Sequence, residues 1–227
     1  MSDEGKPSAS PPEVSHSLAV VAVGLDRGGY LGFVAHEVRN PLSTALWSAE
    51  LLTRLGPEER AGERGLKLAT LGARALGRVQ TLVEDHLLIE RLDAGGYPLR
   101  LELVEVAALL AAVVERLGLE PAPDIQLAPG LAGRGDRALL ERAVEAVVAV
   151  AGRGGVPVWI TGEVGGGQLR VAVRGAPVEP LVDPVKGSWS DPAGRSLSLP
   201  MARRVAEVHG GALTSDGEGY LLVFPAA

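Results

Sequence analysis

Apolar side chains recur every three or four positions along two long stretches of the chain, at about 30–55 and 59–94. This spacing places them on one side of an α-helix, so it predicts two amphipathic helices. Gly56-Pro57 separates the two, because proline suits the first turn of a new helix. Gly95-Gly96 ends the second helix, and Pro41 predicts a bend within the first. Apolar positions of the second helix include Leu66, Ala69, Ala73, Leu76, Val79, Val83 and Leu87.

Two helices of this length joined by a tight turn form a helical hairpin. One hairpin cannot bury the apolar sides of both helices. Two hairpins packed together can bury them as a four-helix bundle. The pattern therefore predicts a homodimer.

After Gly96 the pattern changes to short strands alternating with shorter helices. Mixed elements of this kind predict an α+β arrangement, one sheet under a few helices. Asp136 is placed to cap one of these helices. We divide the chain into a disordered tail and lead-in (1–27), a helical-hairpin domain (28–96) and an α/β domain (97–227). Strands are expected at about 99–104, 125–128, 156–161, 168–173 and twice within 213–224, and helices at 106–117, 137–151 and 197–208.

Composition narrows the functional classes. The chain has 227 residues, 46% of them hydrophobic, with a net charge of −6. No basic block stands out, which argues against nucleic-acid binding. The start of the chain is acidic, and the longest early apolar run, Leu18 to Leu25, is far shorter than a membrane span. We expect a soluble, cytoplasmic protein without a membrane partner.

The chain has no cysteine, which excludes disulfides and thiolate metal sites. Its four histidines form no pair with metal-ligand spacing, so no metal site is predicted. His86 is expected to be a packing or surface residue, and His209 to lie at a helix end near the C-terminal dipole.

The stretch Phe33–Ser43 is the strongest candidate for chemistry. It contains His36, the carboxylate of Glu37 beside it, and Asn40 four residues on. Residues four apart share one face of a helix, so His36 and Asn40 are expected side by side. A neutral imidazole nitrogen is a nucleophile near physiological pH, and a nearby carboxylate can orient it. The stretch therefore predicts a phosphoryl-transfer site.

Over about residues 28–227 the sequence resembles a two-component histidine kinase core. His36-Glu37-Val38-Arg39-Asn40-Pro41-Leu42 is similar to the family's phospho-acceptor box, and residues 88–95 resemble the end of its second dimerisation helix. Residues 197–211 look like the last helix of its ATP-binding domain. The resemblance implies a HisKA-type dimerisation and phospho-acceptor hairpin followed by an α/β sandwich of the histidine-kinase ATPase type.

The resemblance also implies roles for three side chains. His36 would accept the phosphoryl group. Glu37 would orient or deprotonate its imidazole, and Asn40 would position a water molecule for attack on a partner's phospho-aspartate. These three residues are our candidate catalytic residues.

The ATP-binding half departs from the family pattern in three places. The helix at 139–151 has Ala146 and Val150 where asparagines are expected to hold phosphates through magnesium. Arg174 lies at or near the position of the aspartate that reads the adenine amine, and arginine has only donors. Ser196 and Ser198 replace glycines of the phosphate-binding run. We therefore expect a degenerate ATPase-like domain with no bound cofactor, as in histidine phosphotransferases built on a kinase-like dimer.

Three functions follow from this reading. The first is a histidine phosphotransfer protein that carries a phosphoryl group on His36 between response-regulator aspartates. Its partners would be receiver domains, with an upstream histidine kinase as a further candidate, and docking would use Leu42, Ser43, Leu46 and Trp47. The second is an active autokinase with a divergent pocket for ATP and Mg²⁺. The third is a non-catalytic dimeric pseudokinase that modulates a regulator or a kinase.

Overall fold

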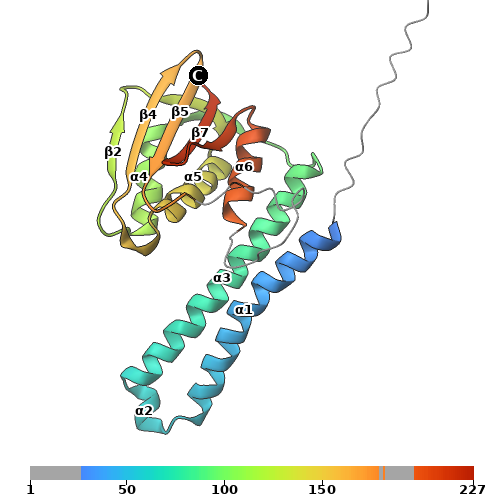
Figure 1. Ribbon diagram of the computed structural model, residues 1–227, viewed down its shortest axis with the longest axis vertical. Helices are drawn as coiled ribbons and strands as arrows, with labels where there is room; N and C mark the ends of the chain where they lie inside the picture. The colour runs from blue at the N-terminus through green and yellow to red at the C-terminus, as the bar shows by residue number, and fades with distance from the viewer. Residues whose placement is uncertain (1–26, 179–180, 182–196) are drawn as a thin grey trace, which may run out of the picture.

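Residues 27–93 fold as a helical hairpin (Figure 1). The computed structural model describes residues 27–178, 181 and 197–227. Helix α1 (Arg27–Arg54) runs antiparallel to α3 (Glu63–Asp93), and the short α2 (Pro57–Ala61) lies at the turn. Helix α1 is continuous through Pro41, whose ring is buried in the hairpin, so the proline does not end it. The second predicted helix is in fact two, because Gly62 has extended backbone angles.

Helix α3 has three distinct faces. Its first face contacts α1 and includes Ala75 and Leu82, both buried. Its second face, near the C-terminal end, includes Asp85, Leu88 and Leu92, which are also buried. A third set of apolar positions is exposed and repeats in steps of three and four, with one step of seven between Leu76 and Val83, which is the spacing of a coiled-coil seam. We call this set, with its counterpart on α1, the outer stripe: Leu66, Ala69, Ala73, Leu76, Val83 and Leu87 of α3, and Leu31, Leu42 and Leu46 of α1.

The second half of the chain is an α/β domain, as the sequence predicts. A five-stranded sheet has the order β2-β4-β5-β7-β6, in which only β2 and β4 are parallel, and β1 pairs with β3 in a separate two-stranded sheet. The elements are β1 (Leu101–Glu105), α4 (Val106–Leu117), β2 (Asp124–Leu127), β3 (Ala132–Asp136), α5 (Arg137–Ala151), η1 (Arg153–Gly155), β4 (Trp159–Gly165), β5 (Gln168–Arg174), α6 (Ser198–Val208), β6 (Ala212–Ser215) and β7 (Gly219–Pro225).

The helices α4, α5 and α6 pack on one face of the five-stranded sheet (Figure 1). Strands β5 and β7 alternate buried and partly exposed residues, which is the pattern of a sheet covered on one side. Val173 and Leu222, for example, are fully buried under the helices. Among the described strands, β3 is the one that the sequence did not predict, because Ala132–Asp136 contains two glycines and no long apolar side chain.

Asp136 joins three parts of the α/β domain. Its Oδ1 accepts a hydrogen bond from the amide of Leu139 at 3.2 Å, as predicted for a helix cap, and its Oδ2 accepts one from the amide of Arg100 at 3.1 Å. The amide of Asp136 donates to Nε2 of His209 at 2.9 Å, and the Nδ1 of this ring donates to the carbonyl of Val205 at 2.7 Å. His209 does end α6, but it is buried and its role is to connect α6 to the start of α5.

Replacing Asp136 by alanine is expected to lower the free energy of unfolding by about 2 kcal/mol. The substitution removes a helix cap and leaves the buried amide of Leu139 and the partly buried amide of Arg100 without their acceptors. Urea denaturation followed by circular dichroism measures the loss. Asp124→Ala is the matched control, because Asp124 is exposed and its carboxylate bonds only Gln126 among the described residues. Equal losses in the two variants would contradict the role given to Asp136.

None of the helices in the described ranges 27–178 and 197–227 is long and apolar enough to cross a membrane.

Candidate phospho-acceptor site

His36 lies in the N-terminal half of α1, where its side chain is half-buried. Because α1 is helical here, Asn40, Ser43 and Trp47 follow on the same face in steps of four, three and four residues. Asn40, Ser43 and Trp47 are all exposed. We call these four residues the His36 face. The structure thus places His36 and Asn40 together, as the sequence predicts.

The four residues that the sequence suggests for docking separate into two groups. Ser43 and Trp47 belong to the His36 face, and Trp47 is 55% exposed. Leu42 and Leu46 belong to the outer stripe, and each lies roughly 80–120° around the helix from His36. Only Ser43 and Trp47 therefore remain in the same surface as the candidate nucleophile.

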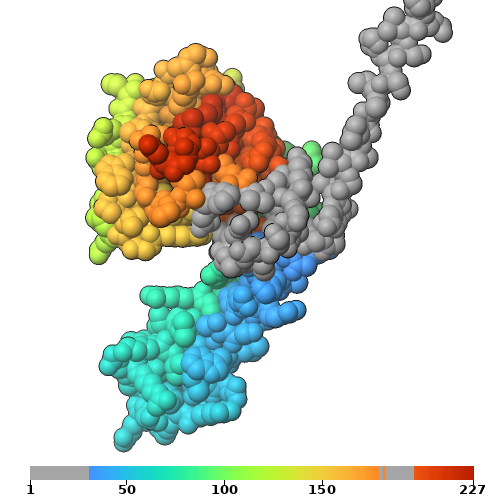
Figure 2. All heavy atoms as spheres, in the orientation of Figure 1, coloured from blue at the N-terminus to red at the C-terminus, as the bar shows by residue number. Residues whose placement is uncertain are grey.

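The His36 face and the α/β domain lie on the same side of the hairpin. On each helix, the outer stripe is roughly 120° from the face that contacts the other helix. On α1, the His36 face is turned from the contact face by about the same angle in the opposite direction. The same holds on α3 for the face that carries Asp85 and Leu88. Because the helices are antiparallel, both turns lead to one side of the hairpin, and the outer stripe lies on the other. The end of the hairpin that carries α2 stands clear of the α/β domain (Figure 2).

Glu37 does not share the His36 face. It is one residue further around α1, and its side chain is only 3% exposed, between α1 and α3. Its Oε2 lies 3.7 Å from Nη2 of Arg78 on α3, and its Oε1 has no hydrogen-bond partner among the described residues. Burial raises the pKa of this carboxyl, while the nearby charges of Arg78 and His36 act in the opposite direction. Glu37 is therefore coupled to His36 by charge.

A partly buried polar cluster, centred on the buried carboxylate of Asp85, joins the hairpin to the α/β domain. Oδ1 of Asp85 lies 2.8 Å from Nη2 of Arg142 on α5, and Oδ2 accepts a hydrogen bond from Oγ of Ser198 on α6 at 3.1 Å. We call Asp85, Arg142 and Ser198 the Asp85 cluster. Burial raises the pKa of Asp85, and its bonds to Arg142 and Ser198 oppose this shift. A second ion pair, between Arg204 on α6 and Asp93 on α3, spans 2.7 Å.

The Asp85 cluster forms one wall of a groove of about 490 Å³ between α3, α4, α5 and α6. We call it the α5 groove. Among the described residues, its lining includes four carboxylates and two guanidinium groups, which together carry two net negative charges. Both arginines are already engaged: Arg142 pairs with Asp85, and Arg116 lies 3.1 Å from Glu141 and 2.6 Å from Glu145. The lining residues are Thr81, Glu84, Asp85, Arg116, Ala138, Glu141, Arg142, Glu145, Ala146, Ala149, Ser198 and Met201.

The two positions of α5 where the family resemblance implies asparagines have different surroundings. Ala146 lines the α5 groove and presents only a methyl group there. Val150 is 3% exposed and belongs to the apolar core. Neither side chain has an oxygen atom for a divalent cation, which prefers oxygen ligands. Among the residues that the structure describes, no cluster of three or more His, Asp or Glu side chains could hold a metal ion.

Arg174 does not enter the α5 groove. Its side chain is 55% exposed and lies 3.4 Å from Glu218 and 3.9 Å from Asp216, in the turn between β6 and β7. The next inward position is Gly175, where a Cβ atom would lie 2.3 Å from the carbonyl oxygen of Ala151. No side chain fits there without moving the end of α5. Of the predicted glycine replacements, Ser196 lies outside the described residues and Ser198 bonds Asp85.

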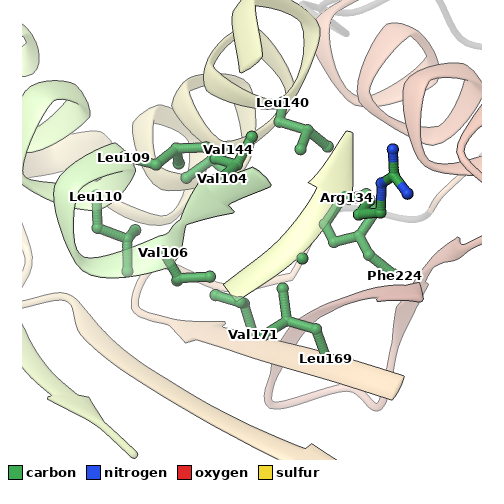
Figure 3. Close-up of a pocket in the computed structure, with 11 residues that line it drawn as sticks. Val104, Val106, Leu109, Leu110, Arg134, Leu140, Val144, Leu169, Val171 and Phe224 are labelled. Carbon is green, nitrogen blue, oxygen red and sulfur yellow. The ribbon is translucent and has the colours of Figure 1, made fainter. Parts of the chain in front are cut away.

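The interior of the α/β domain has one further small cavity, between the sheet, α4 and α5 (Figure 3). Its volume of about 20 Å³ is close to that of a single water molecule. Aliphatic side chains such as Val104, Leu110 and Leu140 surround it, while the guanidinium of Arg134 points away (Figure 3). The cavity is too small and too apolar for a nucleotide.

Comparison with known proteins agrees with this geometry. Residues 26–95 match the family model of the His Kinase A (phospho-acceptor) domain. The chain also superimposes on a histidine kinase of Acinetobacter baumannii, AdeS, with a TM-score of 0.63 and 17% identity, over 83% of this chain and 95% of that one. The chain has a two-component histidine kinase core. The sequence-based assignment to this family and the predicted α+β fold class, a helical hairpin followed by a sandwich of the histidine-kinase ATPase type, are confirmed.

Other relatives of this kinase core are sensor proteins and histidine kinases. The phosphate regulon sensor protein PhoR of Pseudomonas aeruginosa is 32% identical over 112 residues, which is 44% of this chain and 25% of PhoR. The sensor protein DivL of Caulobacter vibrioides is 28% identical over 206 residues, 83% of this chain and 26% of DivL. This chain therefore spans about a quarter of the length of these curated relatives. The histidine kinase ThkA, solved in complex with the response regulator TrrA, has a TM-score of 0.57 at 18% identity, over 88% of this chain and 61% of that one.

Sequence reasoning missed three residues of the kinase core's site: Arg78, Asp85 and Arg142. Each contacts a residue far away in the sequence, so no local motif identifies it. A weak signal did exist for Asp85, because it is a charged residue between the apolar positions Leu82 and Leu88 of α3. Arg142 lies in the same way between Leu139 and Val144 on the otherwise apolar side of α5.

Proposed function

We propose that this chain is a histidine phosphotransfer protein that does not bind ATP. His36 receives a phosphoryl group from the aspartate of one response regulator and passes it to the aspartate of another. In the first step the phosphorus–oxygen bond of the aspartyl phosphate breaks and a phosphorus–nitrogen bond to His36 forms. The second step reverses this exchange on a different receiver. The receiver domains supply the metal ion and the acid–base groups, so this chain needs only its nucleophile and a docking surface.

The proposal rests on the charges and the side chains that line the α5 groove. A nucleoside triphosphate brings several negative charges, and the described residues that line the groove already carry two net negative charges. The groove's two arginines are paired with carboxylates, and Ala146 offers no metal ligand. Phosphate binding there would require like charges to approach one another. These features favour a phosphoryl donor other than bound ATP.

The connection between the domains supports the same proposal. An autokinase must bring its bound nucleotide to the histidine, which requires the ATP-binding domain to move relative to the hairpin. Here Asp85 and Asp93 of α3 hold α5 and α6 through ion pairs of 2.8 and 2.7 Å, and Asp85 is only 2% exposed. A domain held in this way stays in a fixed position beside the His36 face. We propose that receivers dock on Ser43 and Trp47, next to the α/β domain.

We further propose that the outer stripe is the interface of a homodimer, in which four helices form a bundle. The stripe contains long apolar side chains such as Leu66 at 68% and Leu76 at 54% exposed. Their regular spacing on one side of the hairpin is suited to pairing with an identical stripe. The homodimer is inferred from the outer stripe of this chain.

Two labelling experiments test the proposed function. The wild-type chain is expected to gain label from a phosphorylated receiver and none from radioactive ATP with Mg²⁺. His36→Gln is expected to gain no label from either donor, a loss of at least about 100-fold. Glutamine keeps a polar side chain of similar length on α1, so the variant should fold, which circular dichroism checks. His86→Gln is the matched control, because it removes a histidine of α3 away from the His36 face.

Each result has a different meaning. Transfer of label from ATP to His36 would refute the proposal in favour of an autokinase with a divergent pocket. If neither a receiver nor ATP labels the chain, the proposal is refuted and the result supports a non-catalytic pseudokinase. Transfer that survives His36→Gln would move the site to another residue.

A further inference from the structure

The hairpin contains a buried carboxylate that is poorly supplied with hydrogen bonds. Glu37 is 3% exposed, and its Oε1 has no hydrogen-bond partner among the described residues. An ionised carboxylate in such a place is costly unless a positive charge lies nearby. Burial alone would favour the protonated, neutral form. The residue next to the phospho-acceptor would then carry no charge.

Arg78 is the cation that opposes this effect. It lies on α3, and its Nη2 is 3.7 Å from Oε2 of Glu37. The side chain of Arg78 is 55% exposed, so the guanidinium spans from the hairpin surface to the buried carboxylate. The charged groups that act on Glu37 are His36 from α1 and Arg78 from α3. Of the two, only arginine keeps its positive charge at every physiological pH.

We propose that Arg78 is a positioning residue for phosphoryl transfer through His36, because it holds the Glu37 carboxylate ionised beside the imidazole. This inference rests on the proposed function of His36 and adds a residue outside the phospho-acceptor motif. In this role Arg78 does not act on the phosphoryl group directly. It acts through Glu37.

The ionised carboxylate matters most when phosphohistidine gives up its phosphoryl group. The phosphorus–nitrogen bond breaks, its electron pair returns to the ring nitrogen, and the receiver aspartate forms the new phosphorus–oxygen bond. The ring leaves as a neutral imidazole only if its other nitrogen carries a proton throughout. A negative charge on Glu37 favours that protonated ring, because opposite charges nearby stabilise the charged form. A neutral Glu37 would lower the fraction of phosphohistidine in the reactive state.

The test combines a titration with a pH profile. In Arg78→Met, the carboxyl carbon signal of Glu37 in NMR is expected to titrate at higher pH than in wild type, by on the order of one unit. The acidic limb of the rate of transfer from phosphorylated His36 to a receiver should move by the same amount. Arg78→Lys should restore most of both, since lysine keeps the charge. Arg74→Met, one turn earlier on α3, is the matched control and should change neither.

A double variant separates this role from a structural one. In a Glu37→Gln background, Arg78→Met is expected to cause no further change in the pH profile, because no carboxyl remains to be held ionised. A uniform loss of rate at every pH, with an unchanged Glu37 titration, would overturn the proposal. A shift that persists in the Glu37→Gln background would also overturn it. A shifted titration without transfer from any receiver would instead refute the proposed function and leave the pairing of Arg78 with Glu37 supported.

Discussion

Glutamate in place of Leu76 is expected to convert a dimer of this chain into a monomer. Leu76 lies in the middle of the outer stripe and is 54% exposed in a single chain. In a two-fold symmetric interface each substitution occurs twice, so two carboxylates would face an apolar seam. Burying an unpaired charge costs several kcal/mol. The dissociation constant should rise by at least about 100-fold, which corresponds to about 2.7 kcal/mol.

Sedimentation equilibrium over a range of concentrations measures the dissociation constant of both proteins. Leu103→Glu is the matched control, because Leu103 is an equally exposed leucine at 64% but lies on β1, outside the hairpin. The control should remain a dimer. A monomeric wild-type chain, or a Leu76→Glu variant as dimeric as Leu103→Glu, would show that the outer stripe has another partner.

Removing the carboxylate of Asp85 is expected to release the α/β domain from the hairpin. Asp85→Ala should lower the free energy of unfolding by about 3 kcal/mol, because it removes the buried carboxylate that bonds both Arg142 of α5 and Ser198 of α6. Hydrogen exchange of the α6 amides that face α3 should accelerate at the same time. Glu84→Gln is the matched control. Glu84 directly precedes Asp85, its Oε2 lies 3.6 Å from Nη2 of Arg142, and its side chain is half exposed. The control should change stability by less than about 0.5 kcal/mol.

The same residue predicts a pH dependence. Burial raises the pKa of Asp85 in the folded chain, so the folded state binds its proton more tightly than the unfolded state. This contribution to stability is fully present below the ordinary pKa of aspartate, about 4, and is lost as the pH rises through the raised pKa. Asp85→Asn keeps the shape of the side chain and should remove this part of the pH dependence. A wild-type stability that rises through this range because of Asp85 would contradict the assignment.

The sequence predicted the hairpin and most of the sheet because both depend on local periodicity. The apolar rhythm of α1 and α3 and the alternation in β5 and β7 are visible without knowing what packs against them. Strand β3 was missed because it has two glycines and takes its strand geometry from pairing with β1. Its register depends on a neighbour more than twenty residues away, which local propensity does not contain.

The site was predicted in part for the same reason. His36 and Asn40 belong to one helix turn, so their proximity follows from spacing alone. The burial of Glu37 depends on α3, and the Asp85 cluster joins residues 57 and 113 positions apart, so neither was accessible to motif reasoning. The interpretation of Arg174 as a residue in the nucleotide pocket was wrong. Its strand position points it outward to Glu218, and the inward neighbour is Gly175.

The packing at Gly175 has a consequence for the substitutions that this part of the chain can accept. The amide of Ala176 donates a hydrogen bond of 2.6 Å to the carbonyl of Ala151, which closes β5 onto the end of α5. An aspartate introduced at residue 175 would clash with that carbonyl, and an asparagine at 150 would bury an amide in the apolar core, where Val150 is 3% exposed. Each of these substitutions alone would lower the stability of the fold. On the proposed function, no single one of them would turn the relay into a kinase, because each would destabilise the α/β domain before a nucleotide could bind.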